Sequence, residues 1–227
     1  MGKKVIFEDL GRIRYKEAWD YQEKLFEEVI QQKLEKRDDK PQYLLFCEHE
    51  PVYTLGKSGN RQNLLITRSL CESKNIDLHA IDRGGDITYH GPGQLVAYPI
   101  IDLEDFQVGI KRYISMLEDV VIETLKSFGT VGEKDEKAMG VWLDPFLPDK
   151  ARKICAIGVR ASRFVTMHGL ALNVNCDLSY FNYINPCGFT DKGVTSMQKE
   201  LGREVDFQTV RAVMKNAFAD IFGMTYR

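Results

Sequence analysis

Residues 153–175 of this 227-residue chain read KICAIGVRASRFVTMHGLALNVN, and this stretch decides the class of fold. Two apolar runs of strand length flank the pair Ala161-Ser162. Two such runs separated by two residues are typical of an antiparallel hairpin. The pattern therefore predicts strands over Lys153–Arg160 and Arg163–Asn175, with the turn between them.

Other segments extend this reading to a mixed α/β fold. Short runs rich in Val, Ile, Tyr and Phe predict strands at Tyr43–Glu48, Val52–Leu55, Asp86–Tyr89, Gln94–Ile101 and Met139–Leu143. Apolar residues at steps of three and four predict helices over 16–34, about 108–128 with Gly129 as the stop, and about 207–222 with Asp206 as the N-cap. Because strands and helices do not alternate strictly, we expect a largely antiparallel sheet with flanking helices.

Length and composition exclude several classes of protein. At roughly 150 residues per domain, the chain fits one domain over residues 1–227. Lys plus Arg total 31 against 33 Asp plus Glu, whereas a general nucleic-acid binder carries a basic excess. No run of 18 apolar residues and no signal-peptide core occurs, so we expect no membrane segment. The five cysteines contain no C-x-x-C, which favours reduced thiols in the cytoplasm over disulfides or a zinc site.

A glycine-rich segment, residues 83–94, reads RGGDITYHGPGQ and precedes a strongly apolar strand. Such a backbone can approach a ligand closely and present its N–H groups without interfering side chains. Neither of the two common phosphate-binding glycine motifs is present. Composition alone leaves two interpretations open, a ligand-binding loop or a pair of glycine turns around a short strand.

Cys187 lies in an evident loop, Asn185-Pro186-Cys187-Gly188-Phe189, between a rigid and a permissive neighbour. Such a turn can expose a thiol and fix its direction, as a nucleophile requires, but a buried turn residue has the same pattern. The other cysteines fit apolar strand or helix faces, where a thiol behaves as a small hydrophobe. They are Cys47, Cys71, Cys155 and Cys176.

Lys153 begins an otherwise apolar strand, so it is either a solvated strand end or an inward-pointing candidate base. His90 and His168 each lie beside a glycine in an apolar context, which is typical of structural histidines. Cys47-Glu48-His49 has poor geometry for a metal ligand set and no second cluster completes it, so no metal site is expected.

Taken together, the segments around Arg83, Lys153 and Cys187 resemble the lipoyl(octanoyl) transferases, which are the octanoyl-[acyl-carrier-protein]–protein octanoyltransferases of lipoate biosynthesis. The resemblance covers most of the chain, from the helix at Tyr15–Leu34 to Gly188. Its most specific part is the Arg-Gly-Gly-x-x-Thr-Tyr-His-Gly-Pro-Gly-Gln stretch. It implies the fold of the biotin/lipoate protein ligase catalytic domain.

The resemblance also implies roles for particular residues. Cys187 matches the family's acyl-thioester nucleophile, and Lys153 matches the lysine that activates it. Cys155 lies so close to Lys153 in sequence that its own reactivity stays an open question. The residues that match the acyl-substrate site are Arg83, Gly84, Gly85, Asp86, Ile87, Thr88, Tyr89, His90, Ala156, Ile157, Gly158, Gly169, Leu170 and Ala171.

The activity implied is transfer of an octanoyl group from acyl carrier protein, through a Cys187 thioester, to a lysine of lipoyl domains. These acceptors are the E2 subunits of 2-oxoacid dehydrogenases and the glycine cleavage H protein. No cofactor is implied, and we expect a cytoplasmic monomer. One alternative is an ATP-dependent lipoate or biotin ligase, which needs a glycine-rich nucleotide loop and no Cys187. A non-catalytic acyl-binding module is the other, and the presence of both Lys153 and Cys187 speaks against it.

Overall fold

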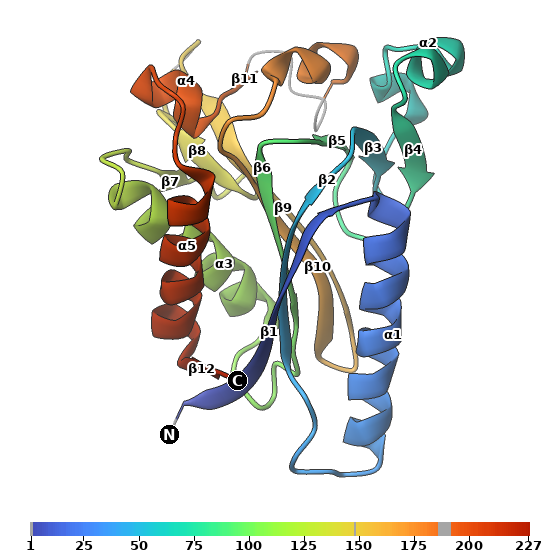
Figure 1. Ribbon diagram of the computed structural model, residues 1–227, viewed down its shortest axis with the longest axis vertical. Helices are drawn as coiled ribbons and strands as arrows, with labels where there is room; N and C mark the ends of the chain where they lie inside the picture. The colour runs from blue at the N-terminus through green and yellow to red at the C-terminus, as the bar shows by residue number, and fades with distance from the viewer. Residues whose placement is uncertain (1, 148, 186–191) are drawn as a thin grey trace.

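The computed structural model describes residues 2–147, 149–185 and 192–227, and a nine-stranded sheet runs through the middle of this part of the chain (Figure 1). The order of its strands is β12-β1-β2-β6-β10-β9-β8-β7, and β11 pairs with β9. The strands are β1 (Lys3–Ile13), β2 (Tyr43–His49), β6 (Gln94–Ile100), β7 (Glu133–Lys134), β8 (Val141–Leu143), β9 (Arg152–Ser162), β10 (Val165–Asn173), β11 (Gly193–Val194) and β12 (Met224–Tyr226).

Most of the main sheet is antiparallel, which confirms the predicted mixed α/β class. The run from β2 through β6, β10, β9 and β8 to β7 is antiparallel throughout. Parallel pairs join β1 to both β2 and β12, and β11 to the start of β9. The β1–β12 pair brings the two ends of the chain together at one edge of the sheet (Figure 1).

Three long helices cover the two faces of this sheet (Figure 1). Helix α1 (Tyr15–Leu34) lies on one face, and α3 (Ile110–Lys126) with α5 (Phe207–Phe222) lies on the other. A small second sheet has the order β4 (Asp77–Ala80), β3 (Val52–Leu55) and β5 (Ile87–His90). The short helical segments are η1 (Arg61–Asn63), α2 (Arg68–Ser73), η2 (Leu178–Tyr183) and α4 (Met197–Leu201).

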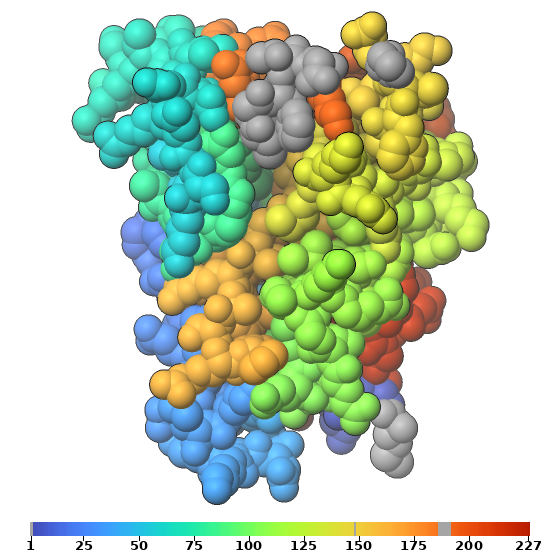
Figure 2. Space-filling view, turned by 180° about the vertical axis from the view of Figure 1, so that it is seen from behind, coloured from blue at the N-terminus to red at the C-terminus, as the bar shows by residue number. Residues whose placement is uncertain are grey.

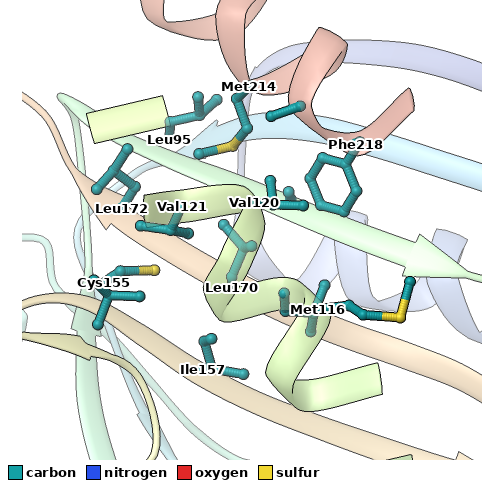
Figure 3. Close-up of a cluster of buried hydrophobic side chains, with 14 of the residues drawn as sticks. Leu95, Met116, Val120, Val121, Cys155, Ile157, Leu170, Leu172, Met214 and Phe218 are labelled. Atoms are coloured by element: carbon teal, nitrogen blue, oxygen red, sulfur yellow. The ribbon is translucent and has the colours of Figure 1, made fainter. Parts of the chain in front are cut away.

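Alternation of side chains along the strands divides the core around the main sheet into two large clusters. In β6, Leu95 and Ala97 pack with α3 and α5, whereas Val96 and Tyr98 belong to the cluster that α1 covers. Figure 3 shows the first cluster, in which side chains of β9 and β10 meet those of α3 and α5. Both faces of the central strands are therefore buried.

The three predicted helices are present with small shifts of their ends. The α5 helix begins after Asp206, whose Oδ1 accepts a hydrogen bond from Thr209 N at 2.9 Å, as the predicted N-cap requires. It ends at Gly223 with φ 65°, a left-handed conformation that glycine adopts without a steric penalty.

The turn of the central hairpin was predicted two residues too early. Ser162 pairs with Val165, so the turn residues are Arg163 and Phe164, and both have positive φ, at 50° and 63°. A two-residue turn with both φ values positive matches the right-handed twist of paired strands, and here it forms without glycine. The strands β1, β4, β7, β11 and β12 were not predicted from the sequence.

Candidate functional site

A cavity of about 320 Å³ lies between the β9–β10 hairpin and the glycine-rich segment 83–94. Seen from behind, the small sheet and α2 (teal) stand on one side of the hairpin, and residues 130–147 (yellow-green to yellow) stand on the other (Figure 2). This volume suits a small-molecule ligand, and most of its lining is apolar.

Small side chains make the floor of this cavity. Ala156 pairs with Ala171 and Gly158 pairs with Gly169 across the β9–β10 hairpin, and all of them line the cavity. A Cβ atom at Gly169 would lie 2.1 Å from the backbone oxygen of Ala97, so only glycine lets β10 approach β6 this closely. The floor is hollow because these positions carry almost no side-chain volume.

Most of the residues assigned to the acyl-substrate site from sequence do meet at this cavity. Its lining includes Arg83, Gly85, Asp86, Ile87, Thr88, His90, Ala156, Ile157, Gly158, Gly169, Leu170 and Ala171. Gly84 and Tyr89 do not line it. Gly84 instead bonds through its N–H to Val159 O at 3.0 Å, and the buried Tyr89 ring stacks on Tyr180 with centroids 4.6 Å apart.

Arg83 stabilises the conformation of the glycine-rich segment through hydrogen bonds to backbone carbonyl groups. Its guanidinium is buried and donates to the carbonyl oxygens of Gly84, Thr54 and Asp86 at 2.8–2.9 Å. The side chain also lies over Gly158, where a Cβ would come within 2.9 Å of Arg83 Cδ. Arg83 therefore holds the loop in its shape against β9.

Lys153 lies at the other side of the cavity, at the start of β9, with Trp142 beside it. Its Nζ donates to Met139 O at 3.0 Å and lies 4.6 Å from the centre of the Trp142 ring. The indole is itself fixed, because Trp142 Nε1 donates to Ala138 O at 2.7 Å. These contacts hold the amine at the wall of the cavity, where Lys153, Met139 and Trp142 are all lining residues.

A second lysine stands close to the same ring. Lys192 Nζ lies 4.7 Å from the centre of Trp142 and forms an ion pair with Asp135 at 2.7 Å. The Lys192 ammonium helps to hold the pKa of the Asp135 carboxyl below its usual value. Cys187 and Gly188 lie outside the described residues, and Lys192 is the first residue described after them.

A chain of buried polar groups connects the glycine-rich segment to Lys153. His90 Nδ1 lies 2.6 Å from Gln94 Oε1, and Gln94 Nε2 donates to Asn173 Oδ1 at 2.8 Å. Asn173 Nδ2 donates to Thr195 O at 2.9 Å, and Thr195 N donates to Lys153 O at 2.9 Å. Such a network fixes the relative positions of the strands that meet at the cavity.

Burial favours the neutral form of two histidines of this region, His90 and His49. Burial lowers the pKa of His90 to about 3 and that of His49 to about 4. Tyr15 packs against both imidazole rings, with centroids 5.9 Å and 5.2 Å away. His168 also lines the cavity, and its Nε2 lies 2.9 Å from Asp82 Oδ1. Tyr15, His90 and His168 therefore form part of the cavity wall.

The four cysteines in the described part of the chain are buried, as predicted. Cys155 lies in the core cluster on the face opposite to the cavity floor (Figure 3). Burial raises the pKa of its thiol to about 12, which leaves almost no thiolate at neutral pH. Cys155 is therefore not a second reactive thiol, although it lies close to Lys153 in sequence.

Sequence reasoning missed several lining residues, among them Tyr15, Tyr98, Trp142, Asn173 and Lys192. Some of these residues are far in sequence from the glycine-rich segment, and others lie in ordinary apolar strands. Only the folded structure shows that they line the same cavity. Within the described ranges, no group of three or more His, Cys, Asp or Glu side chains could hold a metal ion. No helix in those ranges is long and apolar enough to cross a membrane.

A known protein family matches most of this chain. The model of the lipoyl protein ligase A/B catalytic domain matches residues 14–219. The chain belongs to this family. The match includes every residue assigned to the site above, and the family membership predicted from sequence is confirmed.

Several proteins similar to this chain are octanoyltransferases. One from Porphyromonas gingivalis is 56% identical over 96% of this chain, which spans 44% of that longer protein. Another, from Parabacteroides distasonis, is 53% identical over 96% of this chain and 98% of its own length.

Solved structures at lower identity support the fold. An archaeal bipartite lipoate protein ligase from Thermoplasma acidophilum has a TM-score of 0.73 at 14% identity and covers 99% of this chain and 86% of its own. Biotin protein ligase from Aquifex aeolicus has a TM-score of 0.55 at 13% identity over 97% of this chain and 71% of its own. The predicted likeness to the biotin/lipoate ligase fold is confirmed.

Proposed function

We propose that this chain is an octanoyltransferase that moves an octanoyl group from acyl carrier protein to a lysine of a lipoyl domain. The observation that carries the proposal is an apolar cavity beside Lys153 in a chain whose relatives, at about half identity over nearly its whole length, are octanoyltransferases. Apolar walls suit a medium-length acyl chain, and the open floor of Ala156, Gly158, Gly169 and Ala171 leaves space for it.

The first step is an exchange of thioesters. The Cys187 thiolate attacks the octanoyl carbonyl on the phosphopantetheine arm of the carrier protein. The carbon–sulfur bond to the carrier breaks, a new one to Cys187 Sγ forms, and the carrier thiol leaves with a proton. One thioester replaces another, so this step is nearly balanced in free energy and needs no nucleotide.

The second step carries the driving force. The ε-amine of the acceptor lysine attacks the octanoyl-Cys187 carbonyl, and an amide replaces the less stable thioester. The Cys187 thiol is regenerated, so the enzyme returns to its starting state. This two-step route accounts for a site without a phosphate-binding glycine motif.

Lys153 is the group we assign to proton transfer. Its Nζ is positioned at the cavity wall by Met139 O and the Trp142 ring. We assign to it, in its neutral form, acceptance of the proton of Cys187 and later that of the incoming amine. General acid–base help of this kind contributes roughly 10²–10⁴ in rate. Backbone N–H groups of the glycine-rich segment or of Gly188 are candidates to stabilise the oxyanion.

The remaining assignments follow from this function. The partners are octanoyl-acyl carrier protein and the lipoyl domains of E2 subunits and of the glycine cleavage H protein. We assign one catalytic domain to residues 1–227, in keeping with a main sheet that joins β1 to β12. Buried, unpaired cysteines are compatible with the reducing cytoplasm, and we take the enzyme to act there as a monomer.

The test is transfer of octanoyl from octanoyl-acyl carrier protein to a purified lipoyl domain, followed by mass spectrometry of the acceptor. We expect one octanoyl group on the acceptor lysine without ATP. In a parallel reaction, free octanoate with ATP should give none. Transfer that depends on ATP would support the ligase alternative, and binding without transfer would support a non-catalytic acyl-binding module.

A further inference from the structure

We propose that Tyr98 ends the acyl cavity and sets the longest acyl chain that the enzyme accepts. This inference rests on the function proposed above and names the residue that decides chain length. Tyr98 comes from β6, which lies between the small floor residues of β10 and the α1-covered strand β2.

The order of the strands gives the cavity a direction. Trp142 of β8 and Lys153 of β9 stand at one side of it. The floor then crosses β9 and β10, where Ala156 pairs with Ala171. With adjacent strands about 4.8 Å apart, an acyl chain that starts near Lys153 crosses two strands before it meets β6.

At β6 the small side chains end. Ala171 pairs with Val96, and Tyr98 follows on the same face of the strand. Both Val96 and Tyr98 line the cavity. Leu45, which pairs with Tyr98 from β2, is fully buried in the cluster under α1, and among the described residues no member of β2 lines the cavity. The hollow therefore stops at β6.

The Tyr98 ring is fixed in place. Only 4% of Tyr98 is exposed, and its hydroxyl lies 2.7 Å from His49 Nε2. His49 Nδ1 in turn lies 3.0 Å from Ile13 O, and Tyr15 packs against the His49 ring. A buried ring held at its far end cannot swing aside cheaply for a longer chain, so it acts as a rigid end wall.

Truncating the ring should lengthen the cavity. In Tyr98→Met, an unbranched side chain keeps much of the buried volume but can move, and Tyr98→Leu removes the distal half of the ring. Each added methylene that is buried contributes roughly 0.8 kcal/mol, so two of them should favour decanoyl by about fifteen-fold. We expect the decanoyl-to-octanoyl ratio of kcat/KM to rise by about that factor in either variant.

Two further variants distinguish a specific change in acyl-chain preference from a general disturbance of the packing around β6. Tyr98→Phe loses the hydroxyl bond to His49 but keeps the buried ring, so its preference should shift far less than in the two truncations. Ile100, two residues further on the same face of β6, belongs to the α1 cluster but does not line the cavity. Ile100→Val should therefore disturb the same packing without changing the decanoyl-to-octanoyl ratio.

The assay measures kcat/KM with hexanoyl-, octanoyl-, decanoyl- and dodecanoyl-carrier protein, and circular dichroism checks the fold of each variant. An unchanged ratio in a folded Tyr98→Met or Tyr98→Leu protein would overturn the inference, as would an equal shift in Ile100→Val. If neither Tyr98 truncation folds, a wild-type preference in which dodecanoyl equals octanoyl would overturn it on its own. Failure of the wild-type enzyme to transfer any acyl group would instead refute the proposed function.

Discussion

The two faces of the β9–β10 hairpin are built from neighbouring residues and have opposite properties. On the face toward α3 and α5, Cys155 and Leu172 are fully buried in a filled core. On the other face, Ala156 and Ala171, together with paired glycines, leave a cavity. Because side chains alternate along a strand, a one-residue step changes a position from core to cavity. Side-chain size at alternate positions therefore creates the site, and the filled face keeps the strands in place beneath it.

The largest effect is expected from a change at the cavity that leaves the core untouched. Lys153→Met should lower the rate of acyl transfer by roughly 10²–10⁴, because proton transfer fails while the hollow remains. Single-turnover kinetics with octanoyl-carrier protein would measure this loss. The residual rate should recover partly at higher pH, where more Cys187 ionises unaided. Wild-type kinetics at neutral pH would remove Lys153 from the mechanism.

A substitution on the core face of the hairpin, which packs against α3 and α5, should affect stability and leave catalysis intact. Leu172→Ala deletes a fully buried side chain and should lower the free energy of unfolding by about 2–5 kcal/mol. Urea denaturation measures that loss. Since Leu172 does not line the cavity, the kcat of the protein that remains folded should stay near the wild-type value. A similar loss of stability together with a changed chain-length preference would show that the two faces are not independent.

A smaller effect is expected from a change of pH. It concerns the free energy of unfolding and depends on His90, which lines the cavity. Burial lowers the pKa of His90 to about 3, so between about pH 6.5 and that value the unfolded chain binds a proton that the folded chain does not. Stability should therefore fall as pH falls through this window, by roughly 1.4 kcal/mol per pH unit for one histidine. His90→Gln should have a shallower slope of unfolding free energy between pH 6.5 and 5. Equal slopes in the two proteins would contradict the neutral, buried state of His90.

The smallest effect belongs to the thiol on the core face. Cys155→Ala removes one buried sulfur and should cost about 1 kcal/mol of stability, comparable to loss of a methylene group. Octanoyl transfer should be unchanged, because burial raises the pKa of Cys155 to about 12. A large loss of transfer activity in this variant, measured beside Cys187→Ala, would move the nucleophile from Cys187 to Cys155.

Local patterns predicted much of this fold. The helix that begins after Asp206 follows from a cap and an amphipathic stripe, which are properties of adjacent residues. The strand β1 was missed because its partners, β2 and β12, lie about 40 and 220 residues away and supply the pairing that its mixed sequence lacks. The hairpin turn was misplaced because Phe164 at φ 63° is unusual, and the continued pairing of Ser162 with Val165 outweighs that cost.

The candidate site was predicted as three separate segments, around Arg83, Lys153 and Cys187, together with a family likeness. The segment from Arg83 to His90 lies at the cavity, but Arg83 acts through its own loop and Tyr89 points into a separate aromatic cluster. Tyr98 and Trp142 read in sequence as ordinary strand residues. Their position at opposite sides of the cavity depends on strand order, which no local pattern contains.

The most direct test of the central claim is to isolate the acyl-enzyme. Wild-type protein is incubated with octanoyl-acyl carrier protein, without ATP and without an acceptor, and its peptides are mapped by mass spectrometry. We predict one octanoyl group on the peptide that contains Cys187, its removal by neutral hydroxylamine, and its transfer when a lipoyl domain is added. An octanoyl group found on another residue, or transfer to the lipoyl domain by Cys187→Ala at the wild-type rate, would contradict the account.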